Sequence, residues 1–163
     1  MLGFTFTTDV RKVLSNAREE AARLGNPWVD TEHIALAFTR ADTSASRVLR
    51  DIEVDPDALR ETAEHAIHPS DVAPPKGDLP YSRHAKRTLE HALKEAADHG
   101  HDFVGVDHLL IGVIQESDGL GSELLTKHGA TADRVRAHLL EHHPENPARM
   151  PRQDSKRRFF GLF

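Results

Sequence analysis

The sequence contains no cysteine and few aromatic residues, with one tryptophan and one tyrosine among 163 residues. The absence of cysteine excludes disulfide bonds and thiolate zinc sites, and it is consistent with a reducing cytosol. No apolar run approaches the roughly 20 residues that a membrane-spanning helix needs. The first residues, Met1–Phe6, lack the basic head and long apolar stretch of a secretory signal. We therefore expect a cytoplasmic protein without a membrane span.

Motifs of catalysis are also missing. The chain has no Gly-x-x-x-x-Gly-Lys-Ser/Thr phosphate loop and no Gly-x-Ser-x-Gly nucleophile elbow. Its formal net charge of −5 argues against wholesale binding of nucleic acid. The sequence thus predicts a protein that is not an enzyme and uses no cofactor.

Histidine is abundant, with 12 residues, and two pairs have the spacing of metal ligands on a helix. His84 and His91 are two turns apart, and His138 and His142 are four residues apart. A working zinc site needs a third ligand, usually a carboxylate. Glu141 is adjacent to the second pair rather than on its face, and no His-Glu-x-x-His motif occurs. We interpret these histidines as part of solvated helix faces and predict no metal site.

An internal repeat is the strongest positive feature of the chain. Residues 29–38, Val-Asp-Thr-Glu-His-Ile-Ala-Leu-Ala-Phe, return 75 residues later as Val-Gly-Val-Asp-His-Leu-Leu-Ile-Gly-Val. At the same offset Trp28 matches Phe103, and six further residues recur unchanged: Leu14, Ala17, Glu20, Ala21, Ala22 and Gly25. Two copies of one unit predict a duplicated domain whose equivalent residues face each other across a seam.

Apolar residues at three- and four-residue spacing predict helices at about 8–24, 31–40, 45–49 and 56–67 in the first copy. The second copy predicts helices at about 82–99, 106–115, 119–127 and 131–142. Gly25 and Gly100 stand where left-handed helix terminators belong. We therefore predict an all-α fold of eight helices and no strands, arranged as two tandem four-helix repeats with pseudo-twofold symmetry.

Composition divides the chain into one double-repeat domain, residues 1–143, and a tail. Repeat one covers residues 1–67 and repeat two covers residues 81–143. The linker between them, residues 68–80, holds four prolines and one glycine, which exclude regular structure. Residues 144–163 lack an apolar period, and we predict a disordered basic tail with an apolar end.

Thr31-Glu32-His33-Ile34, together with Phe-Thr before the preceding long helix and the same arrangement in the second copy, carries a family resemblance. The chain resembles the N-terminal domain of the Clp/Hsp100 unfoldases, the duplicated Clp repeat domain, and is closest to the ClpC branch. The resemblance covers residues from about 4 to 143. It implies a bacterial cytoplasmic protein of protein quality control. In that family the domain precedes two ATPase modules. Because this chain has no phosphate loop, we expect a free-standing recognition domain here.

In ClpC-type domains the resemblance implies binding of phosphoarginine, other peptide degrons, adaptor proteins or ClpC-targeting compounds. The family's acidic residues that engage the guanidinium group correspond to Glu32 and Asp107. The second copy has Val106 in place of Thr31 and a shorter carboxylate, so we expect a competent first site and a weakened second one. Read without the family, both carboxylates are also explained by the helix dipole alone.

The same ligand needs donors for its phosphoryl group and apolar walls. Helix N-termini near Thr7 and Ser82 offer free N–H groups, and Lys86 adds positive charge. Phe6 and Tyr81 are the expected walls, although a residue in this position also packs inward as a hydrophobic staple. His33 and His108 are interpreted as structural histidines that bond to the backbone.

The tail offers a second kind of contact. Phe160-Gly161-Leu162 resembles the hydrophobic-Gly-hydrophobic tripeptide by which Clp unfoldases dock onto the ClpP peptidase. The main hypothesis is a degron-binding module that delivers, shields or competes for clients of the Clp machine. The alternative is a regulatory module that contacts a Clp unfoldase, ClpP or an adaptor through its helical surface or its tail, with no small ligand.

Overall fold

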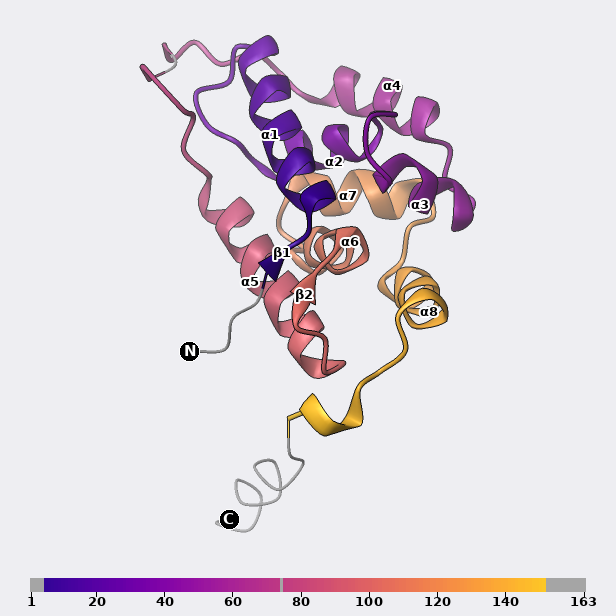
Figure 1. Ribbon diagram of the computed structural model, residues 1–163. Helices are drawn as coiled ribbons and strands as arrows, with labels where there is room; N and C mark the ends of the chain where they lie inside the picture. The colour runs from indigo at the N-terminus through magenta and orange to yellow at the C-terminus, as the bar shows by residue number, and fades with distance from the viewer. Residues whose placement is uncertain (1–4, 74, 152–163) are drawn as a thin grey trace, which may run out of the picture.

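In the computed structural model, which describes residues 5–73 and 75–151, eight α-helices follow one another in two sets of four (Figure 1). The first set comprises α1 (Thr8–Arg23), α2 (Thr31–Phe38), α3 (Ala45–Asp51) and α4 (Pro56–Ala66). The second comprises α5 (Arg83–Asp98), α6 (Val106–Gln115), α7 (Leu120–Lys127) and α8 (Ala132–His142). The predicted all-α fold class and its eight helices are confirmed. The chain between α4 and α5 passes from one copy to the other, where we placed the linker.

Equivalent residues begin and end the long helix of each copy. The hydroxyl groups of Thr7 and Ser82 accept hydrogen bonds from backbone N–H groups three residues further on, at 3.2 and 3.0 Å. Gly25 and Gly100 follow the two helices with φ angles of +70° and +73°. Only glycine adopts this left-handed conformation without steric cost, so these positions stop the helices as predicted.

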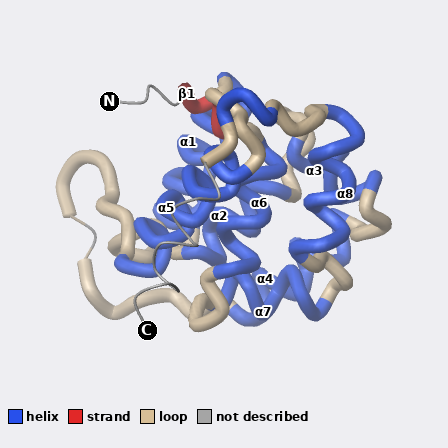
Figure 2. The backbone as a smooth tube through the Cα atoms, turned by 90° about the horizontal axis from the view of Figure 1, so that it is seen from below, coloured by secondary structure: helices blue, strands red, loops and turns tan. Residues whose placement is uncertain are grey.

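The core lies around α2 and α6, which occupy the middle of the molecule (Figure 2). The side chains of both helices are almost entirely buried, and each packs against the long helix of its own copy, α1 or α5. In addition, α7 of the second copy packs against α2 of the first. The two copies therefore share one hydrophobic core.

Two short strands depart from the prediction that the chain has none. β1 (Thr5–Phe6) pairs in parallel with β2 (Phe103–Val104), and an isolated parallel bridge joins Val29 to Tyr81. These residues precede α1, α6, α2 and α5, where the chain is extended before it enters a helix. The periodicity of the sequence did not reveal the pairing because each strand has only two residues.

Each strand pairing joins one repeat to the other, so the chain crosses between the repeats before each long helix. The backbone N–H of Thr7 donates to the carbonyl of Val104 at 3.1 Å, and the N–H of Ser82 donates to the carbonyl of Val29 at 2.8 Å. Each long helix therefore begins beside the start of the second helix of the other copy, where Glu32 or Asp107 lies. This crossing brings together residues that lie about half the chain apart.

Part of the segment predicted as a disordered tail has defined structure. Residues Pro147–Arg149 form a 3₁₀ helix, and the N–H of Asn146 donates to the carbonyl of His99 at 2.9 Å. Arg149 also pairs with Asp102 at 2.6 Å. The contacts that hold this segment are polar, so the pattern of apolar residues did not predict its structure. In the described part of the chain, no helix is both long and apolar enough to cross a membrane.

Candidate functional site

Four of the residues predicted to bind a ligand fall into two clusters, and both repeats contribute to each cluster. Asp107 and Thr7 line a cavity of about 690 Å³, which we call the Asp107 groove. The groove lies between the ends of α1, α3, α6 and α8, and its other polar lining residues include Asp9, Arg47, Asp51, His138 and His142. The second group, which we call the Glu32 cluster, comprises Asp30, Thr31, Glu32, Ser82 and His84. Its members come from the starts of α2 and α5.

In the Asp107 groove, the predicted carboxylate already has a partner. Asp107 is 8% exposed at the second position of α6, and its Oδ2 lies 2.6 Å from Nδ1 of His138. Nε2 of His138 lies 2.9 Å from Oδ2 of Asp51. Burial lowers the pKa of His138, but the hydrogen bonds that its ring donates to Asp107 and Asp51 outweigh it, so the pKa is raised. A guanidinium ligand at Asp107 would therefore compete with an imidazole that already bonds to Oδ2.

In the Glu32 cluster, the carboxylate is half-buried and has no such partner. It accepts a long hydrogen bond from the hydroxyl of Thr31, at 3.5 Å, and a backbone N–H also bonds to it. Across residues 5–73 and 75–151, no lysine, arginine or histidine forms an ion pair with Glu32, and His84 lies 3.7 Å from Glu116 instead. Burial and the charge of Asp30 raise the pKa of Glu32 to about 7. This carboxylate is available to an incoming cation.

Thr31 also joins the start of α2 to α7 of the second repeat. Its hydroxyl accepts a hydrogen bond from the backbone N–H of Gly121 at 2.9 Å. A Cβ atom on Gly121 would lie 2.6 Å from the carbonyl oxygen of Thr31, so only glycine fits beneath it. The equivalent residue of the other copy, Val106, has no hydroxyl. The two segments that carry Glu32 and Asp107, which we call the acidic segments, therefore differ in a contact between repeats as well as in the reach of the carboxylate.

The histidines of the two acidic segments are structural, as the sequence suggested. Nδ1 of His33 accepts the N–H of Asp30 at 2.9 Å, and Nδ1 of His108 accepts the N–H of Gly105 at 2.9 Å. Burial lowers the pKa of His33 to about 4 and the pKa of His108 to about 3. Both rings are therefore neutral at physiological pH and complete the caps of α2 and α6.

The remaining predicted ligand residues have mixed surroundings. The hydroxyl of Ser82 donates to Oδ1 of Asp30 at 2.8 Å, so it is engaged within the Glu32 cluster. Tyr81 and Phe6 are half-buried and pack against the core, and the guanidinium of Arg18 lies over the Tyr81 ring at 4.8 Å. Lys86 is exposed on α5. The predicted docking tripeptide, Phe160-Gly161-Leu162, lies outside the described residues.

Sequence reasoning missed two features of these clusters. His138 and Asp51 contact each other across 87 positions of sequence, and no local motif announces such a pair. Trp28 is 45% exposed and corresponds to Phe103, which lines the Asp107 groove. The alignment of the two copies contained this second signal, because it paired Trp28 with Phe103. Trp28 thus holds, in the first repeat, the position that Phe103 holds beside the Asp107 groove.

Solved structures with a similar helical arrangement include N-terminal domains of Clp-type chaperones. The Hsp104 N-terminal domain from Candida albicans has a TM-score of 0.69 and 18% identity, over 87% of this chain and 94% of that chain. A ClpV N-domain in complex with a VipB peptide has a TM-score of 0.62 and 14% identity, over 78% of this chain and 80% of that chain. At these identities the likeness establishes the fold.

The amino-acid sequence then defines the family. Residues 5–154 match the Clp repeat (R) N-terminal domain, and the chain belongs to this family. It is 31% identical over 149 residues to the chaperone protein ClpB of Oceanobacillus iheyensis, covering 91% of this chain and 18% of that protein. It is 34% identical over 144 residues to the chloroplastic chaperone protein ClpC1 of Arabidopsis thaliana, covering 86% and 15%. The chain thus spans less than a fifth of the length of these relatives, and the predicted resemblance is confirmed.

Proposed function

We propose that this domain binds peptide segments of client or adaptor proteins within a Clp chaperone or proteolysis system, and that the Glu32 cluster recognises an arginine side chain, preferably as phosphoarginine. We assign it no catalytic step. The observation that carries the proposal is the carboxylate of Glu32, half-buried at a helix N-terminus and without an ion-pair partner in the described residues. The pairing of Asp107 with His138 makes the other carboxylate the weaker site.

The chemistry of Glu32 suits a guanidinium group. A carboxylate accepts two parallel hydrogen bonds from guanidinium, which fix orientation as well as charge. Partial burial makes the unpaired carboxylate costly to ionise, and a bound cation offsets that cost. The N-terminal N–H groups of α5, which begins beside the acidic segment, would accommodate the phosphoryl group.

The relatives support a peptide as the natural ligand. One structure of the same fold, the ClpV N-domain, was solved with a VipB peptide. ClpC1, a chaperone, is 34% identical to this chain over the matching region. The exposed side chain of Trp28 would supply apolar contact for residues that flank the arginine.

Calorimetric titration with free phosphoarginine tests the proposal, using the wild-type protein, Glu32→Gln and Asp107→Asn. We expect one dominant site, weakened at least tenfold in Glu32→Gln, because a hydrogen bond to a charged group contributes about 1.5–3 kcal/mol. Asp107→Asn should retain that site, and inorganic phosphate should bind far more weakly.

Equal affinity of wild-type and Glu32→Gln proteins would contradict the assignment of this residue. Absence of heat with a folded protein would contradict phosphoarginine recognition. In that case, capture of a partner protein in the absence of any small ligand would support the alternative of a purely protein-binding module.

A further inference from the structure

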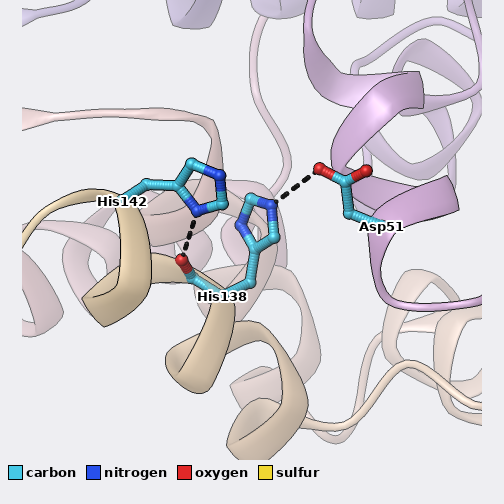
Figure 3. A group of neighbouring side chains, drawn as sticks. All are labelled: Asp51, His138 and His142. Atoms are coloured by element: carbon cyan, nitrogen blue, oxygen red, sulfur yellow. Dashed lines mark hydrogen bonds and ion pairs between the residues drawn. The ribbon is translucent and has the colours of Figure 1, made fainter.

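Three side chains on the wall of the Asp107 groove point toward one another (Figure 3). Asp51 is the last residue of α3, while His138 and His142 lie one turn apart on α8. One carboxylate oxygen and one nitrogen from each ring all lie within 4.8 Å of one another. The sequence showed the histidine pair but no third ligand. The fold supplies that ligand from the first repeat.

The hydrogen bonds of the two rings are those that metal-binding histidines make. Nδ1 of His142 lies 2.8 Å from the carbonyl oxygen of His138, and Nδ1 of His138 lies 2.6 Å from the carboxylate of Asp107. A histidine that binds a metal almost always donates its other N–H to a carbonyl or a carboxylate, which fixes the tautomer and the ring orientation. Both Nε2 atoms are then the ones left for a ligand. The rings also stack, with centroids 4.2 Å apart.

We propose that Asp51, His138 and His142 form a binding site for a divalent transition-metal ion, with Zn²⁺ the best match, and that Asp107 orients His138. Two imidazole nitrogens, one carboxylate oxygen and an open fourth position are a common zinc set. Ca²⁺ and Mg²⁺ prefer oxygen ligands throughout, so the histidines select against them. The proposal concerns the Asp107 groove and does not rest on ligand binding at Glu32.

Small movements bring the three groups into coordination. Two ligands at about 2.1 Å from a tetrahedral zinc ion lie about 3.4 Å apart, so a pair at the 4.8 Å limit must close by about 1.4 Å. The side chain of Asp51 is 45% exposed and that of His142 is exposed, so both have room to rotate. The metal would take the place of the proton between Nε2 of His138 and Asp51. Asp9 and Asp107 add negative charge around the groove, and Arg47 adds one positive charge.

The test is titration of the chelator-treated full chain with Zn²⁺, followed by calorimetry, and with Co²⁺, followed by visible absorption. We expect one ion per chain and an intense band typical of tetrahedral Co²⁺. His142→Ala and Asp51→Asn should each weaken Zn²⁺ binding at least tenfold. His65→Ala is the matched control, because exposed His65 on α4 also has Nδ1 near the carbonyl four residues earlier, at 2.8 Å from Glu61. It lies outside the cluster and should bind Zn²⁺ like the wild type.

Circular dichroism establishes that each variant is folded, and Zn²⁺ should raise the melting temperature of the wild type but not of His142→Ala. The proposal is overturned if Zn²⁺ binds without saturation at one ion per chain. It is equally overturned if His142→Ala and His65→Ala lose the same affinity, since that result indicates diffuse binding to surface histidines. Unchanged affinity in Asp51→Asn would remove the contribution of the first repeat and with it the proposed site.

Discussion

At the scale of single residues, Glu32 and His33 stand side by side on α2 and respond to burial in opposite ways. Burial disfavours the charged form of both, which raises the pKa of the carboxyl group to about 7 and lowers the pKa of the imidazole to about 4. His33 is 1% exposed, and its Nε2 also bonds to Asn26 at 2.8 Å. His33 is thus a buried group with both ring nitrogens hydrogen-bonded, whereas Glu32 is half-buried and forms no ion pair in the described residues.

Glu32→Gln should stabilise the free protein at alkaline pH. Between the unfolded pKa near 4.5 and the folded value of about 7, the native state holds the proton more tightly, so stability falls as pH rises through this window. The variant lacks that loss and should be about 1–3 kcal/mol more stable at pH 8. Urea unfolding at pH 5 and pH 8 measures the effect, with exposed Glu61→Gln as control. A difference that does not change with pH would contradict it.

His33→Gln should reduce sensitivity to acid. The pKa of His33 is lowered from 6.5 to about 4, so the unfolded state takes up the proton first and stability falls as pH drops through this window. The shift corresponds to roughly 3 kcal/mol for the wild type. Glutamine can still cap the helix but does not titrate. Unfolding free energies measured from pH 7.5 to pH 4.5 should decline less steeply in the variant; parallel curves would show that His33 does not cause the acid loss.

At the scale of elements, the same ion pair joins the first and last helices of each copy. Glu20 on α1 pairs with Arg60 on α4 at 2.8 Å, and Glu95 on α5 pairs with Arg136 on α8 at 2.6 Å. Both carboxylates are buried, which by itself raises a pKa, yet hydrogen bonds from the arginines keep both pKa values lowered. The duplication has therefore preserved a long-range polar contact together with the helix periodicity.

Arg60→Met and Arg136→Met should each cost about 1–3 kcal/mol, because each leaves a buried carboxylate with fewer partners. The loss is not larger, since Arg23 still pairs with Glu20 and His99 with Glu95. Adding Glu20→Met to Arg60→Met should recover part of the stability, because it removes the stranded charge. Denaturant unfolding of the double-mutant cycle measures the coupling. Strictly additive losses would show that the pair does not act as a unit.

At the scale of the whole molecule, the shared core and the crossed strands make the two repeats interdependent. α2 contacts helices of both copies, and α7 is joined to α2 through the bond from Gly121 to Thr31. A domain assembled in this way has no surface along which one repeat separates intact. We therefore expect one cooperative unfolding transition rather than two.

A substitution that destabilises the second repeat should accordingly destabilise the first repeat as well. Gly112 on α6 lies against α5, and a Cβ atom there would come within 2.5 Å of the carbonyl oxygen of Thr88. Gly112→Ala should destabilise the protein by about 1–3 kcal/mol through overpacking. The fluorescence of Trp28, the only tryptophan, reports on the first repeat. The urea midpoint of the fluorescence transition should shift together with that of the circular dichroism transition. An unshifted Trp28 transition would indicate that the repeats unfold independently.

The helices, their caps, the duplication and the family were all predicted from the order of the residues. The signals that define a helix act within a few residues, so they can be predicted from the sequence. They are the apolar periodicity, the hydroxyl groups of Thr7 and Ser82, and the glycines that follow the long helices. The identities of Glu32 and Asp107 as equivalent acidic positions were equally visible. Their roles as ligand contacts stay a prediction.

The partner of each carboxylate, in contrast, depends on how the helices pack. Asp107 meets His138 and Asp51 in one groove, whereas Glu32 lies beside the start of α5 with no ion-pair partner in the described residues. The short strands and the contact of Asn146 with the end of α5 depend on the same crossing of the chain. These contacts join residues tens of positions apart, and their formation depends on how two similar units pack. The two copies share one pattern but differ at many positions, so their difference in chemistry arises both from these substitutions and from the neighbours that folding supplies.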